Sequence, residues 1–221
     1  MSKRLNREQM AQRLAADIPA GSYVNIGIGM PERVAHYLSP EKEIILHSEN
    51  GMLGMGPEAP EDEQDWELVN AGKRPVTLLT GGAYFDHVTS FSMMRGGHLD
   101  ICVMGGMQVS AAGDLANWNL GRPDEPPAVG GAMDLAVGAR NVYILMEHNT
   151  RDGGYKIVES CTLPLTGAGV VKRIYTDLAV LAITPHALQV LQMNKGLSFR
   201  ELQAHTGAPL LPPEYPSDAA T

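Results

Sequence analysis

The first apolar residues of the chain recur at helical spacing. Met10, Leu14 and Ile18 lie three to four positions apart, which predicts an amphipathic helix. Asn6 stands where an N-cap is expected, and Gln9 follows three residues later, so the two form a capping box. The Pro-Ala-Gly stretch after Ile18 predicts the end of this helix.

Short apolar runs then alternate with helical patterns over the first two thirds of the chain. A glycine turn between two β-type runs also predicts a hairpin at 107–110 and 115–118. Alternating strands and helices are typical of parallel βαβ units. The predicted strands are 23–28, 44–47, 76–79, 99–104 and 142–146, and the predicted helices are 31–38, 87–94 and 132–137.

The last third is richer in short β-type segments, at 156–158, 170–175 and 178–183. A second capping box, Ser198 with Glu201, predicts a final helix that ends near Gly207. We therefore predict an α/β fold with a mostly parallel open sheet, flanked by helices and extra β-rich segments. Without an internal linker or repeat, residues 1–211 form one domain, and the proline-rich residues 212–221 form a loose tail.

Several predicted strands end in glycine or in a polar residue. In open α/β sheets, ligands bind at the carboxyl ends of the strands. Gly27, Glu49, Gly81 and Gly105 each follow a predicted strand. We therefore expect these four residues to lie along one edge of the sheet.

Composition narrows the class of protein. The 221 residues are 44% hydrophobic and carry a net charge of −8 without a run of basic residues, which argues against nucleic-acid binding. No apolar run approaches the ~20 residues that span a bilayer, and the charged N-terminus does not resemble a secretory signal. Neither Cys102 nor Cys161 belongs to a disulfide or metal-binding pattern. We expect a reduced, cytoplasmic protein without a metal site.

The stretch GIGMP, residues 27–31, joins a predicted strand to a predicted helix. A glycine turn at a helix N-terminus exposes backbone N–H groups that bind anions. However, Glu32 interrupts the spacing of the dinucleotide-binding fingerprint. A plain strand-to-helix turn explains the stretch as well as an anion site does.

Glu49 lies in LHSENGMLGMGP, residues 46–57, at the end of an apolar run and before three glycines. Asn50 and Gly51 form a strong turn dipeptide, so Glu49 could be a polar turn residue. Alternatively, a glutamate of ordinary pKa, about 4.3, is ionised at neutral pH and can attack a carbonyl group. A partly dry pocket would remove water from the carboxylate and make it a better nucleophile. The residues alone leave both interpretations open.

LHSENG closely resembles the signature of the 3-oxoacid CoA-transferases, specifically of their B (beta) chain. Six further motifs of that family occur in order over nearly the whole chain. They are VNIGIG (24–29), NAGK (70–73), MRGGHLD (94–100), GDLANW (113–118), GGAMDL (130–135) and LPLTG (163–167). The resemblance implies a fold that sugar-phosphate isomerases and ligand-sensing domains also use.

The resemblance also implies a mechanism in which Glu49 attacks an acyl-CoA thioester and then carries CoA as a glutamyl thioester. Coenzyme A is a substrate there, and no tightly bound cofactor is needed. The implied site residues are Glu49, Gly130 and Gly131 for catalysis, and Asn25, Gly27, Gly29, Asn50 and Lys73 for binding substrate and CoA. The family further implies a CoA-transferase A (alpha) subunit as partner, in an α2β2 assembly.

Residues 76–85 and 90–94 are most similar to family members that transfer CoA from succinyl-CoA to 3-oxoadipate. Acetoacetate is the alternative acceptor. An acyl-CoA hydrolase or a ligand-binding module on the same fold are alternatives of other classes. The sequence departs from the family pattern at Glu32, Arg33, Met52, Met107 and Gly154, which leaves the acceptor more open than the type of reaction.

Overall fold

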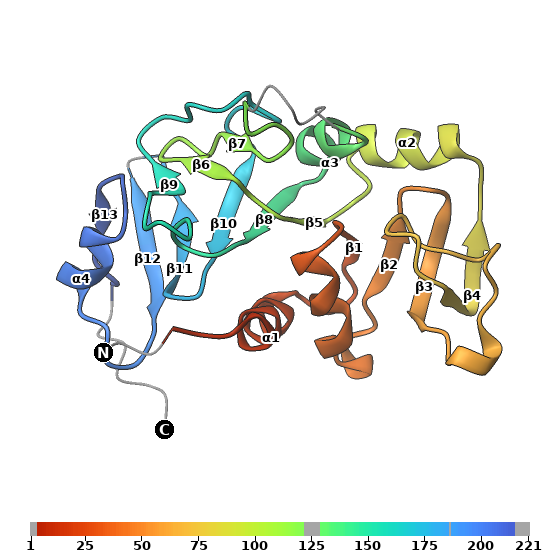
Figure 1. The fold of residues 1–221 in the computed structure, drawn as a ribbon. Helices are drawn as coiled ribbons and strands as arrows, with labels where there is room; N and C mark the ends of the chain where they lie inside the picture. The colour runs from red at the N-terminus through yellow and green to blue at the C-terminus, as the bar shows by residue number, and fades with distance from the viewer. Residues whose placement is uncertain (1–3, 122–128, 186, 215–221) are drawn as a thin grey trace.

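The computed structural model describes residues 4–121, 129–185 and 187–214. Most of the chain forms one ten-stranded sheet (Figure 1). Its strands are β1 (Tyr23–Ile26), β2 (Ile45–Ser48), β3 (Met52–Glu58), β4 (Val76–Tyr84), β5 (Ile101–Met104), β8 (Asn141–Leu145), β10 (Val171–Tyr175), β11 (Ala179–Ile183), β12 (Leu188–Met193) and β13 (Leu210–Leu211).

A small second sheet consists of β6 (Gln108–Ser110), β7 (Leu115–Ala116) and β9 (Ile157–Val158). The α-helices are α1 (Arg7–Asp17), α2 (His87–Arg95), α3 (Ala132–Gly138) and α4 (Phe199–Ala204). Three 3₁₀-helices complete the described residues: η1 (Met30–Tyr37), η2 (Pro40–Lys42) and η3 (Glu61–Glu63). None of these helices is both long enough and apolar enough to cross a bilayer.

The centre of the large sheet is parallel and its flanks are mainly antiparallel. The strand order is β13-β12-β11-β10-β8-β5-β1-β2-β3-β4, and the pairs from β10 to β2 are parallel. The pairs β10–β11, β11–β12, β2–β3 and β3–β4 are antiparallel. The predicted α/β class with a mostly parallel sheet is therefore confirmed.

Both predicted capping boxes form. The Gln9 backbone N–H donates to Asn6 Oδ1 at 2.8 Å, and the Asn6 N–H donates to Gln9 Oε1 at 3.0 Å, so α1 begins where the sequence predicts. Ser198 and Glu201 form the corresponding pair at the start of α4. The hairpin predicted from residues 107–118 is the antiparallel pair β6–β7.

The segment 30–37 is a 3₁₀-helix rather than the α-helix that the sequence predicts. Hydrogen bonds span three residues, as from the Leu38 N–H to Ala35 O. The buried residues Pro31 and Val34 are also three positions apart. A 3₁₀-helix repeats every three residues, so it places both side chains on the same face, toward the core.

The region around Gly81 differs from the prediction more strongly. We predicted a strand over 76–79 that ends in glycine, whereas β4 continues to Tyr84 and pairs with the unpredicted strand β3. A β-carbon on Gly54 would lie 2.9 Å from Gly82 Cα, so these glycines permit close approach within the hairpin. Gly81 therefore lies inside a strand and does not join the other residues at the sheet edge. The strands β12 and β13 were also not predicted.

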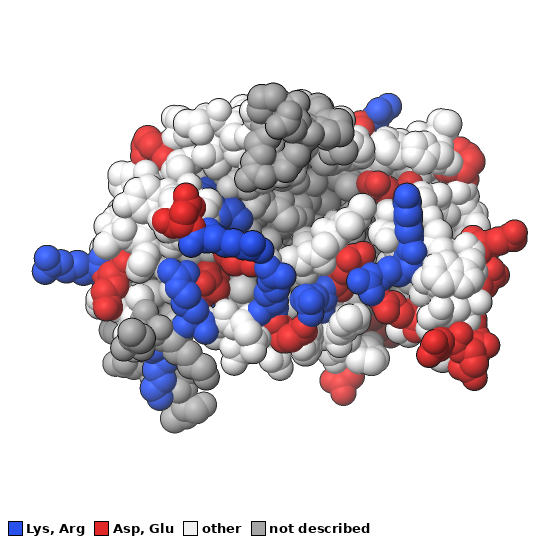
Figure 2. Space-filling model, in the orientation of Figure 1, with Lys and Arg blue, Asp and Glu red and all other residues white. Residues whose placement is uncertain are grey.

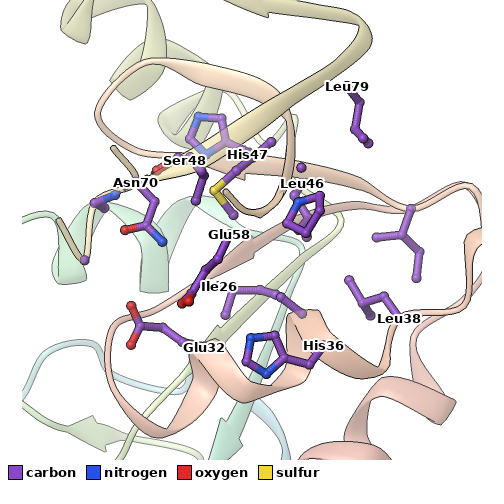
Figure 3. A pocket seen from close by; sticks show the side chains of 18 of the residues that line it. Ile26, Glu32, His36, Leu38, Leu46, His47, Ser48, Glu58, Asn70 and Leu79 are labelled. Atoms are coloured by element: carbon purple, nitrogen blue, oxygen red, sulfur yellow. Dashed lines mark hydrogen bonds between the residues drawn. The ribbon is translucent and has the colours of Figure 1, made fainter. Parts of the chain in front are cut away.

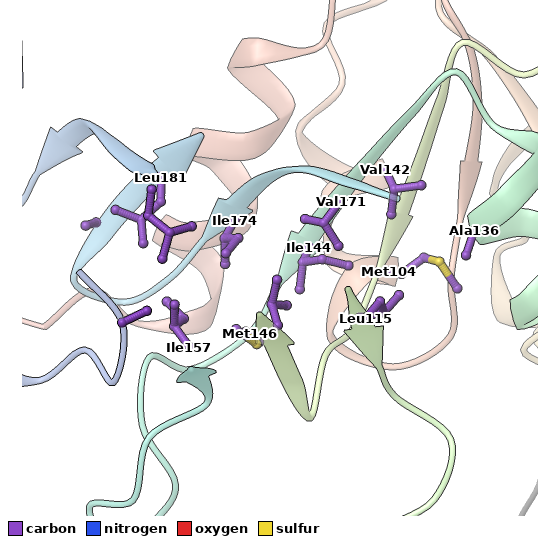
Figure 4. Packing of buried hydrophobic residues seen from close by; sticks show 14 of the residues in the cluster. Met104, Leu115, Ala136, Val142, Ile144, Met146, Ile157, Val171, Ile174 and Leu181 are labelled. Atoms are coloured by element: carbon purple, nitrogen blue, oxygen red, sulfur yellow. The ribbon is translucent and has the colours of Figure 1, made fainter. Parts of the chain in front are cut away.

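Two hydrophobic clusters cover the two faces of the large sheet. One cluster lies between the sheet, the small sheet and α3, and includes Ile144, Met146 and Ile174 (Figure 4). The other packs Met10 and Leu14 of α1 against sheet residues. The carboxyl ends of the parallel strands thus emerge between two packed layers, where a site can be held rigidly.

Candidate active site

Glu49 directly follows β2, in the turn that leads to β3. The Gly51 N–H donates to Ser48 O at 3.0 Å, and Gly51 has φ of +119°, which favours glycine. A β-carbon on Gly51 would also lie 2.1 Å from Phe85 O. The Asn50-Gly51 turn therefore exists, and it presents Glu49 at the carboxyl end of a central strand.

The carboxylate of Glu49 is partly buried and lies against Gly131, the residue that precedes α3. A β-carbon on Gly131 would stand 2.7 Å from Glu49 Oε2 and 3.1 Å from the ring of Phe91. Among the described residues, no side chain or backbone group forms a hydrogen bond or an ion pair with this carboxylate. It is available to react, and Gly131 leaves the space beside it open.

Burial raises the pKa of Glu49 above its ordinary value. The nearby His87 partly opposes this effect, and the negative charge of Asp134 adds to it. A carboxylate that has lost part of its water shell is a stronger nucleophile than one in bulk water. The structure thus provides the environment that the nucleophilic interpretation of Glu49 requires.

The residues on both sides of Glu49 are tied to the turn at 69–73. Ser48 Oγ donates to Asn50 Oδ1 at 2.6 Å and accepts from the Ala71 N–H at 3.1 Å. Asn50 Nδ2 donates to Val69 O at 2.7 Å. The predicted ligand-binding residue Asn50 is therefore engaged in holding this turn, and Ser48 was not predicted to contribute to the site.

The same turn presents Lys73. Its side chain is exposed, and its backbone has φ of +62°, a strained value for a residue with a side chain. The Lys73 N–H donates to Asn70 O at 2.9 Å, which closes the turn. Through Ser48 and Asn50, the position of this lysine is coupled to that of Glu49.

Asn25 lies below the site rather than in it, because its side chain is only 3% exposed. Its Nδ2 group donates to His47 Nδ1 at 3.1 Å and to His47 O at 3.2 Å. His47 Nε2 in turn lies 3.1 Å from Ser90 Oγ. This network joins β1, β2 and α2 beneath Glu49, and no motif in the sequence had indicated the contribution of Ser90.

The glycine loop after β1 is already occupied by a carboxylate of the chain itself. The Gly29 N–H donates to Glu32 Oε2 at 3.1 Å. Glu32 Oε1 would lie 2.2 Å from a β-carbon on Gly72, and Glu32 Oε2 lies 4.0 Å from Arg74 Nε. Glu32, one of the departures from the family pattern, thus connects the Gly27–Gly29 loop with the turn at 69–73.

A mainly apolar cavity of about 480 Å³ lies next to these two loops (Figure 3). Ile26, Leu38 and Leu79 contribute apolar surface, while Ser48 and Glu32 lie at its polar side. The predicted residues Gly27 and Gly130 lie at the carboxyl end of β1 and before α3. The Gly27 N–H donates to Val103 O at 2.8 Å, and Gly130 has open space on its side-chain side.

Other polar residues that the motifs contain have structural partners. Arg95 pairs with Asp134 at 2.6 Å, and Asp100 pairs with Arg140 at 2.8 Å, so Arg95 and Asp100 belong to separate ion pairs. Within residues 4–121, 129–185 and 187–214, no cluster of His, Cys, Asp and Glu is suited to hold a metal ion.

Comparison with known proteins gives one consistent result. Residues 7–195 match a family model described as Coenzyme A transferase. The B chain of 3-oxoadipate CoA-transferase from Pseudomonas putida KT2440 is 59% identical over 96% of this chain and 99% of its own length. The B chain of succinyl-CoA:3-ketoacid coenzyme A transferase from Helicobacter pylori 26695 is 42% identical over 91% of this chain and 97% of its own.

Solved structures show the same fold at low sequence identity. The acyl-CoA transferase YdiF from Escherichia coli O157:H7 superposes with a TM-score of 0.74 at 16% identity. The match covers 97% of this chain and 44% of that longer chain. This chain therefore spans less than half of that single-chain protein.

Proposed function

The chain belongs to the coenzyme A transferase family, and on this premise we propose that it is the beta subunit of a 3-oxoadipate CoA-transferase. The observation that carries this proposal is the partly buried carboxylate of Glu49, which lies against Gly131 and forms no bond with another described residue. This is the arrangement that a nucleophilic glutamate needs.

The proposed reaction conserves the thioester. The Glu49 carboxylate attacks the carbonyl carbon of succinyl-CoA, the C–S bond breaks, and a mixed anhydride and the CoA thiolate form. The thiolate then attacks the glutamyl carbonyl, which releases succinate and leaves CoA on Glu49. The carboxylate of 3-oxoadipate enters by the reverse sequence, which yields 3-oxoadipyl-CoA and free Glu49. Because each step exchanges one carboxylate for another of similar basicity, no ATP is consumed.

The surroundings of Glu49 support these steps. In this proposal, the N–H groups of Gly130 and Gly131 stabilise the oxyanion that forms at each attack. Gly27 and Gly29 border the thioester, and the adjacent apolar cavity takes the pantetheine arm of CoA. Lys73 supplies a positive charge for the CoA or acyl group. Asn25 acts from below, through the orientation of His47.

The acceptor is proposed from the relatives. Identity to the relative named for 3-oxoadipate is 59%, against 42% for the one named for 3-ketoacids in general. Both relatives are named as one of two lettered subunits, so this chain acts with an A (alpha) subunit, and we propose an α2β2 assembly. Coenzyme A is the substrate that passes through the site, and the steps use only carboxylates and a thiolate.

Mass spectrometry of the complex tests the proposal. After incubation of this chain and its alpha partner with succinyl-CoA, we expect a CoA-sized adduct on the peptide that contains Glu49, and none in Glu49→Gln. Rapid release of free CoA without an adduct would identify a hydrolase, and neither adduct nor release would identify a binding module. Comparing 3-oxoadipate with acetoacetate as acceptor then decides between the two transferase activities.

A further inference from the structure

A second cavity, of about 680 Å³, opens at the carboxyl ends of β5 and β8, away from the apolar cavity. It is the more polar of the two and is rich in cations. Lys and Arg side chains gather over the middle of the face seen in Figure 2, interspersed with Asp and Glu. The charged residues that line the cavity are Arg4, Arg7, Arg151, Lys156, Glu147 and Asp177.

Two of the cations are already paired with the two carboxylates. Arg4 Nη1 lies 2.6 Å from Asp177 Oδ2, and Arg7 Nη2 lies 2.7 Å from Glu147 Oε1. These pairs leave both carboxylates with a close cationic partner. The cavity therefore keeps an excess of positive charge that comes from its two other cations.

Those two cations are Lys156 and Arg151. Neither forms a side-chain hydrogen bond or an ion pair with any residue in the described part of the chain. Lys156 is partly buried, and burial lowers its pKa, although Glu147 and Asp177 favour its charged form. Removing an ammonium group from water without a close anion costs free energy, so this site is suited to an anion that arrives with a ligand.

The sheet places this cavity beside Glu49. Along the edge of carboxyl ends, β2 is followed by β1, β5 and β8. Neighbouring strands are about 4.8 Å apart, so the ends of β2 and β5 are separated by roughly 10 Å. Glycines occupy the intervening positions, and a β-carbon on Gly105 would meet no atom within 4 Å. The edge between Glu49 and the cavity thus has open space for a short chain.

We propose that this cavity binds the distal carboxylate of dicarboxylic acyl groups, with Lys156 as the principal cation and Arg151 at the entrance. The inference rests on the proposed function, because succinyl-CoA and 3-oxoadipate each carry a second carboxylate beyond the reacting carbonyl. A lysine on a flexible four-carbon stem can reach toward a chain that extends from Glu49. A partly buried cation would then select dicarboxylic acids over monocarboxylic acids of the same length.

The test measures how fast each acid removes CoA from Glu49. The intact complex is loaded with succinyl-CoA, excess ligand is removed, and decay of the Glu49 adduct is followed with succinate or with butyrate. These acids have equal length, and only succinate has the distal carboxylate. The variants are Lys156→Met, Lys156→Arg and Arg151→Gln. Lys172→Met, an exposed lysine at the amino end of β10, is the matched control.

We expect the wild-type complex to react faster with succinate than with butyrate. Lys156→Met should slow succinate by roughly 10- to 150-fold, the range for losing a hydrogen bond to a charged group, and leave butyrate unchanged. Lys156→Arg should restore most of the succinate rate, and Arg151→Gln should reduce it less. Lys172→Met should match the wild type.

Three results would overturn the inference. The first is equal reactivity of the wild type with both acids. The second is an equal loss with both acids in Lys156→Met. The third is failure of Lys156→Met to associate with the alpha partner, measured by size-exclusion chromatography, which would make the cavity a contact between the two chains. If the wild-type complex forms no adduct at all, the proposed function itself fails, and that outcome is seen before any variant is compared.

Discussion

The buried His47 makes the stability of this protein sensitive to acid. The side chain is 1% exposed, and burial lowers its pKa from 6.5 to about 4. Asn25 fixes the form of the ring: its Nδ2 group donates both to His47 Nδ1 and to His47 O. Turning that amide over would set Asn25 Oδ1 against the His47 carbonyl oxygen. His47 Nδ1 is therefore an acceptor, and the neutral ring donates from Nε2 to Ser90 Oγ.

The sign and size of the effect follow from proton linkage. Between pH 6.5 and about pH 4, the unfolded state binds a proton at His47 and the folded state does not, so stability falls as the pH falls. One pKa unit corresponds to about 1.4 kcal/mol, so the full contribution of His47 is roughly 3 kcal/mol. About 2 kcal/mol of this is lost between pH 7 and pH 5.

Urea unfolding at pH 7 and pH 5, at constant ionic strength, measures this loss. His47→Gln keeps a polar side chain but removes the titration, so we expect its free energy of unfolding to fall by about 2 kcal/mol less than that of the wild type. His98→Gln, at an exposed position, is the matched control and should behave like the wild type. Equal losses in His47→Gln and the wild type would refute the reasoning, because the packing cost of the substitution is the same at both pH values.

Three further predictions concern the site. Glu49→Gln should stop CoA transfer but slightly raise the free energy of unfolding at pH 7, because burial raises the pKa of Glu49 and so disfavours its charged form in the folded state; a clear loss of stability in urea unfolding would contradict this. Gly131→Ala should lower the transfer rate by about 100-fold, because the new methyl group would lie 2.7 Å from Glu49 Oε2 and displace the nucleophile; its backbone φ of −83° suits alanine, so the melting temperature should change little. Ser48→Ala should reduce kcat by roughly tenfold with an unfolding cost of about 1 kcal/mol, since it removes the bonds to Asn50 and Ala71; Ser48→Thr keeps the hydroxyl and should recover activity, and full activity in Ser48→Ala would exclude the positioning role.

Local signals in the chain predicted the elements whose formation depends on near neighbours. The capping boxes at Asn6 and Ser198 hold because each pair lies three residues apart and satisfies donors that every helix leaves free. The central parallel strands were predicted from apolar runs, because both faces of these strands are buried. In contrast, β3 and β4 were misjudged around Gly81, since glycine signals a turn and a close strand contact equally well.

For the site, the family motifs pointed to Glu49 and to Gly130 and Gly131, which are far apart in sequence. Only the fold shows that Gly131 touches the carboxylate, because this contact needs the turn after β2 and the start of α3 to meet. Asn25 and Asn50 could not be placed from sequence. Their amides are committed to His47 and to Val69, partners that lie 22 and 19 residues away.

The sequence by itself determined the helix boundaries, the apolar strands and the type of chemistry, since these depend on residue types and spacings along one short stretch. Tertiary structure alone decided which polar groups pair, how strongly Glu49 and His47 are desolvated, and where unpaired cations remain. The physical reason is that hydrogen bonding and burial depend on distances between segments, and strands remote in the chain become neighbours only when the sheet assembles.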